Sequence, residues 1–425
     1  MSEPPRPSPH MALVKFLAQV KTKSIDFFVT TNYKVIQQIG NGSYGVVCSA
    51  TRTEDGKDDI VVAVKQIAMP ATCEPRAPHP LSDFEIVASR TLREIRILKF
   101  LAEQLRSEGV VNMDNFIVVS DILQMRSKDV DTVYTVTQLM PSDLHAVLRN
   151  PQQSLGNDHV QHMMYNLLRA LKYLHSAGII HRDIKPQNVL VNDSSDVVLC
   201  DFGLARGNSD HYMTVYVETR WYRAPELIMG MDHYDERVDI WSLGCVMAEM
   251  LLPVGKRDPL WRGLHAKNQL DLIICTIGVP TSAALGNLGT SSARTYLDKM
   301  RLMDYVPKTS QLGLCFPPTT DPAAIDLLDK MLAFLPQDRM TAEQCLAHPY
   351  FAGHHDADDE PVCRKRYVDP ALDFVYDIGM SSSVRSRRLK DMLYDEMITF
   401  HPELAGLDPS EVFTSEKDTL DDVTP

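Results

Sequence analysis

The chain has 425 residues, of which 44% are hydrophobic and 23% charged, so it can bury a sizeable core and cannot be mainly disordered. No run approaches the roughly 18 apolar residues that a membrane span needs, and the first ten residues lack the apolar core of a secretory signal. The formal net charge of −13 disfavours binding to nucleic acid or to a membrane, so we expect a cytoplasmic protein that can also be nuclear.

The first part of the chain predicts a sheet. One helical pattern interrupts it from Ala88, where Leu92, Ile95 and Leu98 recur at helical spacing and can pack on the sheet. A five-stranded antiparallel sheet is expected from the β-branched runs that begin at Tyr33, Val46, Ile60, Phe116 and Val133.

Beyond Pro141 the apolar spacing becomes helical. We expect a helix opened by Asp158 and closed by Gly178. Further helices are predicted at residues 238–251, 268–278, 323–332 and 341–351. Loop-like segments are predicted at residues 1 to about 25, at the proline-rich stretch 70–80, and from about residue 402 to the acidic end.

A glycine-rich segment, GNGSYGVV, runs from Gly40 to Val47. A dinucleotide-binding version of G-x-G-x-x-G should open a helix and carry an acidic residue about 20 positions later, whereas here a strand follows and Lys65 stands at that place. Glycines between two strands let backbone N–H groups approach phosphate oxygens without Cβ clashes. We therefore expect this hairpin to cover the phosphates of a nucleoside triphosphate.

Lys65 lies on a predicted strand, in VAVK, and a partly buried lysine needs an anionic partner. Glu94 of the long helix is the best candidate. Paired in this way, Lys65 can hold the α- and β-phosphates, and the helix position becomes an on/off control. An ordinary surface ion pair is the competing interpretation of these two residues.

Two further motifs carry the chemistry, HRDIKPQNVL from His181 and DFG from Asp201. Asp183 can orient or accept the proton of a substrate hydroxyl, and Lys185 can neutralise charge on the transferred phosphoryl group. Asn188 and Asp201 offer oxygen ligands to Mg²⁺. APE at 224–226 closes a segment long enough to be an activation loop.

These motifs, in this order over about residues 33–351, resemble the eukaryotic protein kinases. Thr214-Val215-Tyr216 and TRWYRAPE are similar to the activation segment of the mitogen-activated protein (MAP) kinase family. An extra segment from about Pro280 to Pro318 and the acidic stretch HHDADDEP from His354 resemble that family's insert and its docking site for basic motifs.

The resemblance implies an α+β, bilobal protein kinase fold. The β-rich N-lobe would span 33–140 and the mostly α-helical C-lobe, with the MAP kinase insert, 141–351. An N-terminal extension would occupy 1–32 and a C-terminal extension with an acidic tail 352–425. It further implies a monomer that transfers the γ-phosphate of ATP, with Mg²⁺, to serine or threonine followed by proline in protein substrates.

The resemblance also assigns roles by residue. Thr137 would be the gatekeeper and 138–140 the hinge that binds adenine. The implied catalytic residues are Lys65, Glu94, Asp183, Lys185 and Thr219. The implied ATP-binding residues are Ile39, Gly40, Asn41, Gly42, Ser43, Tyr44, Gly45, Val46, Val47, Ala63, Lys65, Thr137, Gln138, Leu139, Met140, Asp143, Leu190 and Cys200.

Regulation is implied by the same resemblance. Thr214 and Tyr216 would be phosphorylated by an upstream dual-specificity kinase and dephosphorylated by phosphatases. Phospho-Thr214 would bind Arg93, Arg182 and Arg206, and phospho-Tyr216 would bind Arg220 and Arg223, which would also shape the proline preference. Partners would dock on Asp356, Asp359 and Glu360.

Several alternatives stay open at this stage. A kinase-fold scaffold without activity is disfavoured because Lys65, Asp183 and Asp201 are all present. The Thr-x-Tyr spacing and the acidic stretch disfavour a cyclin-dependent-like kinase. The acidic stretch could also be a solvated turn or, with its two histidines, a metal site, and Cys200 a buried structural thiol.

The sequence also departs from the family pattern. Glu218 stands where a small alanine is usual, Val215 is unusual between the phosphosites, and 70–83 is an insertion. These three departures leave the pathway branch and the substrate preference open.

Overall fold

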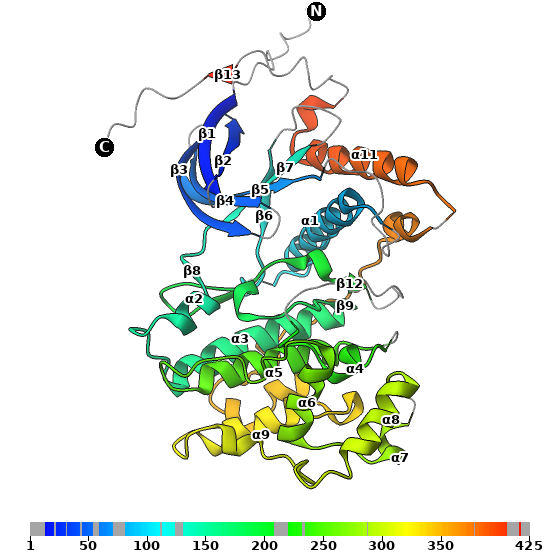
Figure 1. Ribbon diagram of the computed structural model, residues 1–425. Helices are drawn as coiled ribbons and strands as arrows, with labels where there is room; N and C mark the ends of the chain where they lie inside the picture. Colours follow the sequence, from blue (N-terminus) through cyan, green and yellow to red (C-terminus); the bar gives the residue numbers. More distant parts are fainter. Residues whose placement is uncertain are drawn as a thin grey trace, which may run out of the picture. The chain divides into compact units, whose positions relative to one another are not determined.

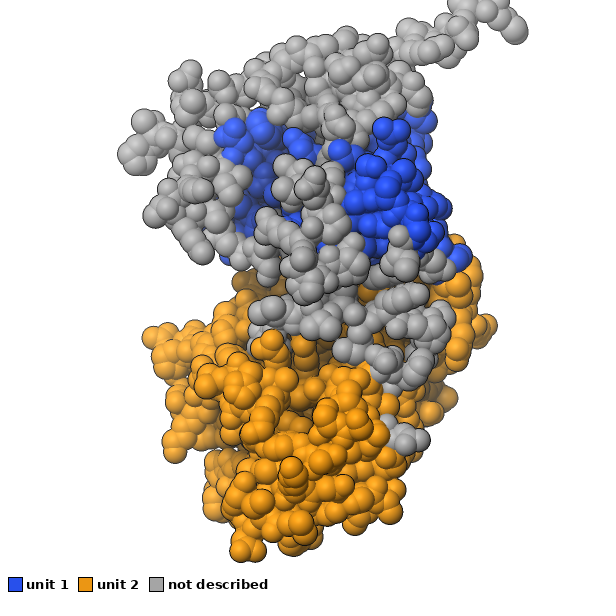
Figure 2. Space-filling model, turned by 45° about the vertical axis from the view of Figure 1, so that its right-hand side comes forward, with its two compact units in different colours: residues 1–99, 117–139, 369–425 blue, residues 100–116, 140–368 orange. Residues whose placement is uncertain are grey.

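The computed structural model describes residues 13–20, 23–30, 32–42, 45–53, 59–70, 81–110, 113–123, 131–207, 220–231, 234–286, 288–377, 379–405 and 416–417. The chain divides into two compact units (Figure 2). Unit 1 comprises residues 1–99, 117–139 and 369–425, and unit 2 comprises residues 100–116 and 140–368.

The helices and strands are distributed between the two units (Figure 1). Unit 1 holds β1 (Leu13–Val20), β2 (Lys23–Thr30), β3 (Tyr33–Gly42), β4 (Gly45–Arg52), β5 (Ile60–Ala68), most of α1 (Asp83–Ser107), β6 (Val119–Ile122), β7 (Thr132–Gln138), α11 (Ser382–Phe400) and β13 (Glu416–Lys417). Unit 2 holds β8 (Ser142–Asp143), α2 (Leu144–Arg149), α3 (Asn157–Ser176), β9 (Ile179–Ile180), β10 (Val189–Val191), β11 (Val197–Leu199), β12 (Arg206–Gly207), α4 (Pro225–Ile228), α5 (Arg237–Leu251), α6 (Ala266–Ile277), α7 (Ser282–Leu285), α8 (Ser291–Met300), α9 (Pro322–Met331) and α10 (Ala342–Leu346).

A five-stranded sheet organises unit 1, in the order β3-β4-β5-β7-β6 with every pair antiparallel, which confirms the predicted sheet. Successive side chains of a strand point to opposite faces. Val46, Val64 and Val136 are fully buried on one face, where Phe27 and Val29 of β2 complete an apolar cluster. Lys65 and its same-face neighbours lie on the other face of the sheet.

That other face packs against α1 and α11, which lie side by side (Figure 1). Ile67 of β5 and Leu92 of α1 share one apolar cluster with Leu389 and Leu393 of α11. The four residues are at most 3% exposed, and burying each such side chain contributes about 1.5–3 kcal/mol. The C-terminal helix is therefore part of the core of unit 1.

Ion pairs fix α11 and the segment before it to α1. Glu85 of α1 accepts a hydrogen bond from Arg385 at 2.8 Å, and both side chains are buried. Further along α1, Arg96 lies 2.7 Å from Glu396 of α11 and 3.2 Å from Asp369, in the segment before α11. These contacts hold the helix that carries Glu94.

Two segments predicted to be loop-like contain strands in the parts that the structure describes. The first, residues 1 to about 25, contains β1 and the start of β2, which pair along their full length. Phe27 anchors this hairpin, since it is fully buried and its ring centroid lies 5.2 Å from that of Tyr134. In the acidic end, β13 pairs with β1, with Leu13 opposite Glu416. Residues 71–80 lie outside the described residues.

A largely buried histidine–carboxylate pair involves His401, which follows α11. His401 Nε2 lies 2.9 Å from Asp121 Oδ1, while Tyr33 donates to the other carboxylate oxygen at 2.7 Å. Burial would lower the pKa of His401, but the hydrogen bond and charge of Asp121 raise it above the ordinary 6.5. Burial would raise the pKa of Asp121, and the same histidine, with Tyr33, lowers it.

We expect His401→Asn to destabilise the protein mainly at mildly acid pH. A raised histidine pKa stabilises the folded state fully below about pH 6.5, and this is lost as pH rises through the raised value. The lowered pKa of Asp121 contributes stability above the ordinary carboxyl pKa, and this stability is lost as pH falls through the lowered value. Urea unfolding should show a larger deficit at about pH 6 than at about pH 9. His354→Asn is the control, since His354 has no carboxylate partner among the described residues, and an equal deficit at both pH values would contradict the prediction.

Unit 2 is mostly helical, as predicted, and α5, α6 and α9 lie at the helices expected at 238–251, 268–278 and 323–332. The helix expected at 341–351 is shorter, because α10 covers only Ala342–Leu346 and a separate 3-10 turn covers Pro349–Phe351. The long helix α3 begins at Asn157 rather than being opened by Asp158, because the ring of His159 accepts the Gly156 N–H at 3.2 Å. Gly178, with φ of 74°, follows its end as expected. Among the described helices, none has both the length and the apolar character that a membrane crossing requires.

Candidate active site

The segment between β9 and β10 brings three predicted residues together. Lys185 Nζ lies 2.6 Å from Asp183 Oδ2, and the side-chain amide of Asn188 donates to the same oxygen at 2.8 Å. Both donors therefore hold one carboxylate oxygen of Asp183. Its Oδ1 accepts no hydrogen bond from the described residues and can receive a substrate proton.

Asp239 of α5 holds the backbone of this segment in place through hydrogen bonds. It is fully buried and accepts hydrogen bonds from the backbone N–H groups of His181 and Arg182, both at 2.8 Å. The ring of His175 lies 3.0 Å away. Burial would raise the pKa of Asp239, but these hydrogen bonds and the histidines lower it. The carboxylate thereby accepts the backbone N–H of Arg182, a residue whose φ of 69° is unusual for a residue other than glycine.

The DFG segment is tied to the same place. Val189 of β10 pairs with Leu199 of β11, and Cys200 N–H donates to the carbonyl of Asn188 at 3.1 Å. Asn188 and Asp201 are thereby placed at the ends of adjacent strands. Asp201 has φ of 62°, and the ring of the following Phe202 lies 4.7 Å from that of His181. Cys200 is half-buried.

The oxygens in this region fit a hard cation. The Asn188 amide nitrogen donates to both Asp183 O and Oδ2, which orients Oδ1 of Asn188 away from those contacts. Together with the carboxylate of Asp201 this makes two oxygen ligands from the protein, and Mg²⁺ in phosphoryl-transfer sites is bound by one or two such groups plus substrate phosphates.

Unit 1 contributes the predicted nucleotide residues of the sheet. Lys65 is paired in register with Val47 and Thr135, and Ala63 with Thr137, so these side chains share one face. Lys65 Nζ lies 3.5 Å from Glu94 Oε2, with side-chain exposures of 30% and 17%. The predicted lysine–glutamate pair is thus present, at the long end of hydrogen-bond distances.

The remaining predicted ATP-binding residues lie on several different elements. No residue larger than glycine fits at position 45, since a Cβ there would lie 1.8 Å from the carbonyl oxygen of Gln66. Gln138 accepts the Val118 N–H, and Asp143 caps α2 by accepting the Ala146 N–H. Ile39, Gly40, Gly42 and Val46 lie on β3 and β4, Leu139 and Met140 follow β7, and Leu190 lies on β10. Ser43 and Tyr44, and the side chain of Asn41, lie outside the described residues.

Most of the activation segment, including Thr214, Tyr216, Glu218 and Thr219, lies outside the described residues. Burial raises the pKa of Tyr234, and the positive charges of Arg182 and Arg206 lower it in part. Arg93 lies on α1 in unit 1 and is 5% exposed. Arg220 and Arg223 are half-buried.

The end of the activation segment is anchored. Glu226 of APE forms two hydrogen bonds with Arg339, at 2.8 and 3.1 Å, and the two side chains are 1% and 0% exposed. Arg339 lies with its guanidinium carbon 5.0 Å from the ring centroid of Trp241. Neither Arg339 nor Asp239 was identified from the sequence, although an aspartate within the apolar run 238–251 was a usable signal.

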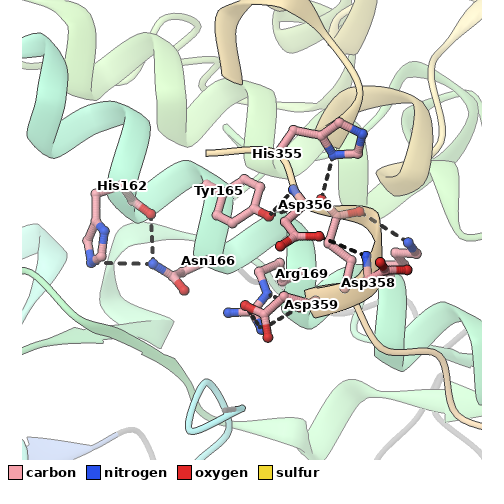
Figure 3. A network of polar contacts seen from close by, with 10 residues as sticks. His162, Tyr165, Asn166, Arg169, His355, Asp356, Asp358 and Asp359 are labelled. Atoms are coloured by element: carbon pink, nitrogen blue, oxygen red, sulfur yellow. Dashed lines mark hydrogen bonds and ion pairs between the residues drawn. The ribbon is translucent and has the colours of Figure 1, made fainter. Parts of the chain in front are cut away.

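The acidic stretch forms a turn that contacts α3 (Figure 3). Glu360 is 3% exposed and receives Lys172 at 3.1 Å, His355 at 2.7 Å and Tyr165 at 3.0 Å. Burial would raise the pKa of Glu360, but these three partners lower it. The expectation that Glu360 is a docking acid is wrong, because its carboxylate is turned inward and holds the turn together.

The neighbouring acids are exposed. Asp359 lies 3.2 Å from Arg169, yet its side chain is 48% exposed. Asp356 caps the short 3-10 helix Ala357–Asp359 by accepting the Asp358 N–H at 3.0 Å. The sequence analysis did not select Asp358, which is exposed beside Asp356 (Figure 3). Three acids, Asp356, Asp358 and Asp359, therefore face outward from this turn.

Comparison with known proteins agrees with this geometry. The family described as the protein kinase domain matches residues 33–351. The chain is 39% identical over 382 residues to extracellular signal-regulated kinase 1 of Dictyostelium discoideum, covering 89% of this chain and 64% of that protein. It is 38% identical over 383 residues to mitogen-activated protein kinase 1 of Oryza sativa subsp. japonica, covering 89% and 85% of the two chains. It is 40% identical over 346 residues to mitogen-activated protein kinase spk1 of Schizosaccharomyces pombe, covering 80% and 83%.

The chain spans 64% of the length of the Dictyostelium relative and larger shares of the rice and fission-yeast relatives. Three quarters of the chain match the kinase family, and each relative named is 38–40% identical to the chain over at least 80% of its length. The chain therefore belongs to the mitogen-activated protein kinase family of serine/threonine protein kinases, which use ATP as their phosphate donor.

Proposed function

We propose that the catalytic domain spans residues 33–351, with lobes 33–140 and 141–351, and transfers the γ-phosphate of ATP to serine or threonine before proline in substrates of a signalling cascade. The observation that carries this proposal is the contact of Asp183 with Lys185 and Asn188. The protein acts as a monomer in the cytoplasm and the nucleus.

The chain's own groups suit an in-line transfer. The substrate hydroxyl oxygen forms a bond to the γ-phosphorus, the bond to the β–γ bridging oxygen breaks, and ADP leaves. Asp183 Oδ1 orients the hydroxyl and takes its proton. Lys185, at 2.6 Å from the other oxygen, supplies positive charge beside the transferred group. Lys65 holds the α- and β-phosphates while Glu94 fixes its side chain.

The two oxygen ligands, Asn188 Oδ1 and the carboxylate of Asp201, would hold Mg²⁺. When bound, the ion supplies positive charge to the phosphate oxygens on which negative charge develops. Because the Asn188 amide is oriented by two hydrogen bonds from its nitrogen, its oxygen needs no reorientation to serve as a ligand.

Activation is expected to require phosphorylation of Thr214 and Tyr216. Each phosphate adds nearly two negative charges, which arginines can bind. The test measures Mg-ATP-dependent phosphorylation of a Ser-Pro peptide before and after treatment with an upstream dual-specificity kinase. Wild type should rise in activity, and Thr214→Ala/Tyr216→Phe should not. A wild type that stays at the level of a variant lacking Asp183, even when doubly phosphorylated, would sink the proposal in favour of a scaffold.

Docking of basic partner segments is expected to involve Asp356, Asp358 and Asp359. Asp356→Asn/Asp358→Asn should weaken binding of a fluorescent peptide rich in lysine and arginine by about two- to thirtyfold, since exposed charge pairs contribute about 0.2–1 kcal/mol each. The deficit should shrink in high salt. Fluorescence anisotropy measures the affinity, and Asp304→Asn, an exposed acid elsewhere in unit 2, is the control.

An equal affinity for the double variant and wild type would refute the docking role. Glu360→Gln separates docking from folding of the turn. It should lower the thermal stability of the turn, because Lys172 would lose its buried carboxylate.

A further inference from the structure

Unit 2 contains a cavity of about 350 Å³ that includes none of the predicted catalytic, nucleotide or docking residues. Segments far apart in the sequence meet there. They are the start of α3, the end of α5, the loop after α5, and the segment before α9. Val160 and Met250 are buried in its wall, with Leu252 and Pro317 half-buried. This volume lies at the lower end of the range of small-molecule pockets, roughly 300–1,000 Å³.

A buried cation lines this cavity. Arg257 is 3% exposed, and its Nε and Nη1 atoms donate to the carbonyls of Leu252 at 3.2 Å and Gln153 at 2.8 Å. No carboxylate forms an ion pair with Arg257 within the described part of the chain. Burial accordingly lowers the pKa of Arg257, and no acidic group opposes this effect. A buried charge is costly unless it is paired.

The nearest acidic side chains are committed elsewhere. Asp258, the next residue, lies 2.6 Å from Arg149 and 3.3 Å from Arg262. Asp321 also lines the cavity, where it caps α9 by accepting the Ala323 N–H at 2.8 Å. Neither acid changes the pKa of Arg257. The lining of the cavity therefore includes apolar and polar groups, the carboxylate of Asp321, and one guanidinium, that of Arg257, with which no carboxylate of the described residues pairs.

A purely structural role for Arg257 is the simpler explanation. In that role the guanidinium joins the loop at Gln153 to the loop at Leu252 through the two carbonyls. These bonds use two of the five N–H donors of an arginine, and they do not need a full positive charge. A structural role thus accounts for the two contacts but leaves the charge beside the cavity unexplained.

We propose that this cavity binds a small carboxylic acid with an apolar body. Its hydrocarbon part would lie against Val160, Met250 and Leu252, and its carboxylate would pair with Arg257. The ligand is a small molecule rather than an acidic peptide, because the volume accommodates one short chain and only one cation faces it. The proposal does not depend on kinase activity, and its readout is binding alone.

The test titrates octanoate and 1-octanol, which have the same chain length, into the full-length protein by isothermal titration calorimetry. Octanoate should bind with one-to-one stoichiometry, and 1-octanol roughly ten- to hundredfold more weakly, as expected for loss of a hydrogen-bonded charge. Arg257→Met should bind the two probes equally. Lys256→Met is the matched control, since Lys256 is an exposed cation one position away, and it should keep the wild-type preference.

A blocking variant keeps the test decisive if Arg257→Met unfolds. Thr320→Trp places a large ring on the half-buried cavity wall without removing Arg257, and it should weaken octanoate binding at least about tenfold. Absence of saturable octanoate binding by wild type would overturn the proposal. So would an unchanged preference in Arg257→Met, or wild-type affinity in a folded Thr320→Trp protein.

Discussion

Asp183→Asn should reduce the rate of phosphoryl transfer by about 10²- to 10⁴-fold, the range typical of a lost general acid–base group. The amide keeps the shape of the side chain but cannot take the substrate proton. It also removes the negative charge that holds Lys185 at 2.6 Å. The rate constant kcat should therefore fall, while the KM for ATP should change little, because the residues that we propose bind the nucleotide phosphates, Lys65 and the glycine-rich hairpin, are unaltered.

The measurement compares kcat and KM of activated wild type and variant with a Ser-Pro peptide. Asp304→Asn, an exposed carboxylate in the insert, controls for loss of one negative charge and should retain wild-type kinetics. Thermal unfolding of Asp183→Asn should match wild type closely. A folded variant with wild-type kcat would show that Asp183 is not the group that positions the hydroxyl.

Arg339→Met should lower the free energy of unfolding by about 3–5 kcal/mol or more, the cost of leaving one member of a buried ion pair alone. Its five N–H donors are all used. Two bonds go to Glu226, and the rest go to the carbonyls of Arg237, Ala333 and Phe334. Methionine fills part of the volume but removes the donors that Arg339 supplies to the carboxylate and to the three carbonyls. Because Glu226 closes the activation segment, activity should fall as well.

A double variant tests the electrostatic part of this prediction. Arg339→Met/Glu226→Gln leaves no charge on either member of this pair, so urea unfolding should find it more stable than Arg339→Met alone. Lys330→Met, which breaks an exposed pair with Asp326, should cost at most about 1 kcal/mol and serves as the control. A single variant no less stable than Lys330→Met would contradict the assigned role of Arg339.

The sheet and the larger helices of unit 2 could be predicted because their signals are local. β5 alternates buried and half-buried residues over positions 62–66, β7 is a short β-branched run with four consecutive buried residues, and α3 repeats apolar residues at helical spacing. α11 was missed, although Leu389, Leu393 and Met397 follow a helical period, because seven charged residues lie among the same 19 positions. Its burial depends on α1 and β5, which no local pattern reveals.

The motifs that identify the kinase family could also be recognised, since their order and spacing along the chain are specific. Their support was not. Asp239 and Arg339 lie on other segments, and only the folded chain brings them to His181 and Glu226. Glu360 was misassigned for the same reason: in the sequence it is one acid among four, and only its contact with Lys172 distinguishes it.

The discontinuous composition of unit 1 has a consequence for synthesis on the ribosome. Every residue of unit 2 falls between 100 and 368, so its core can close while the end of the chain is still being translated. The apolar face of α1 and β5 has no such early partner, because Leu389, Leu393 and Leu404 are made after the whole of unit 2. The nascent chain must therefore carry an uncovered hydrophobic surface until residues 389–404 have left the ribosome, and this surface is where a cellular chaperone would be needed.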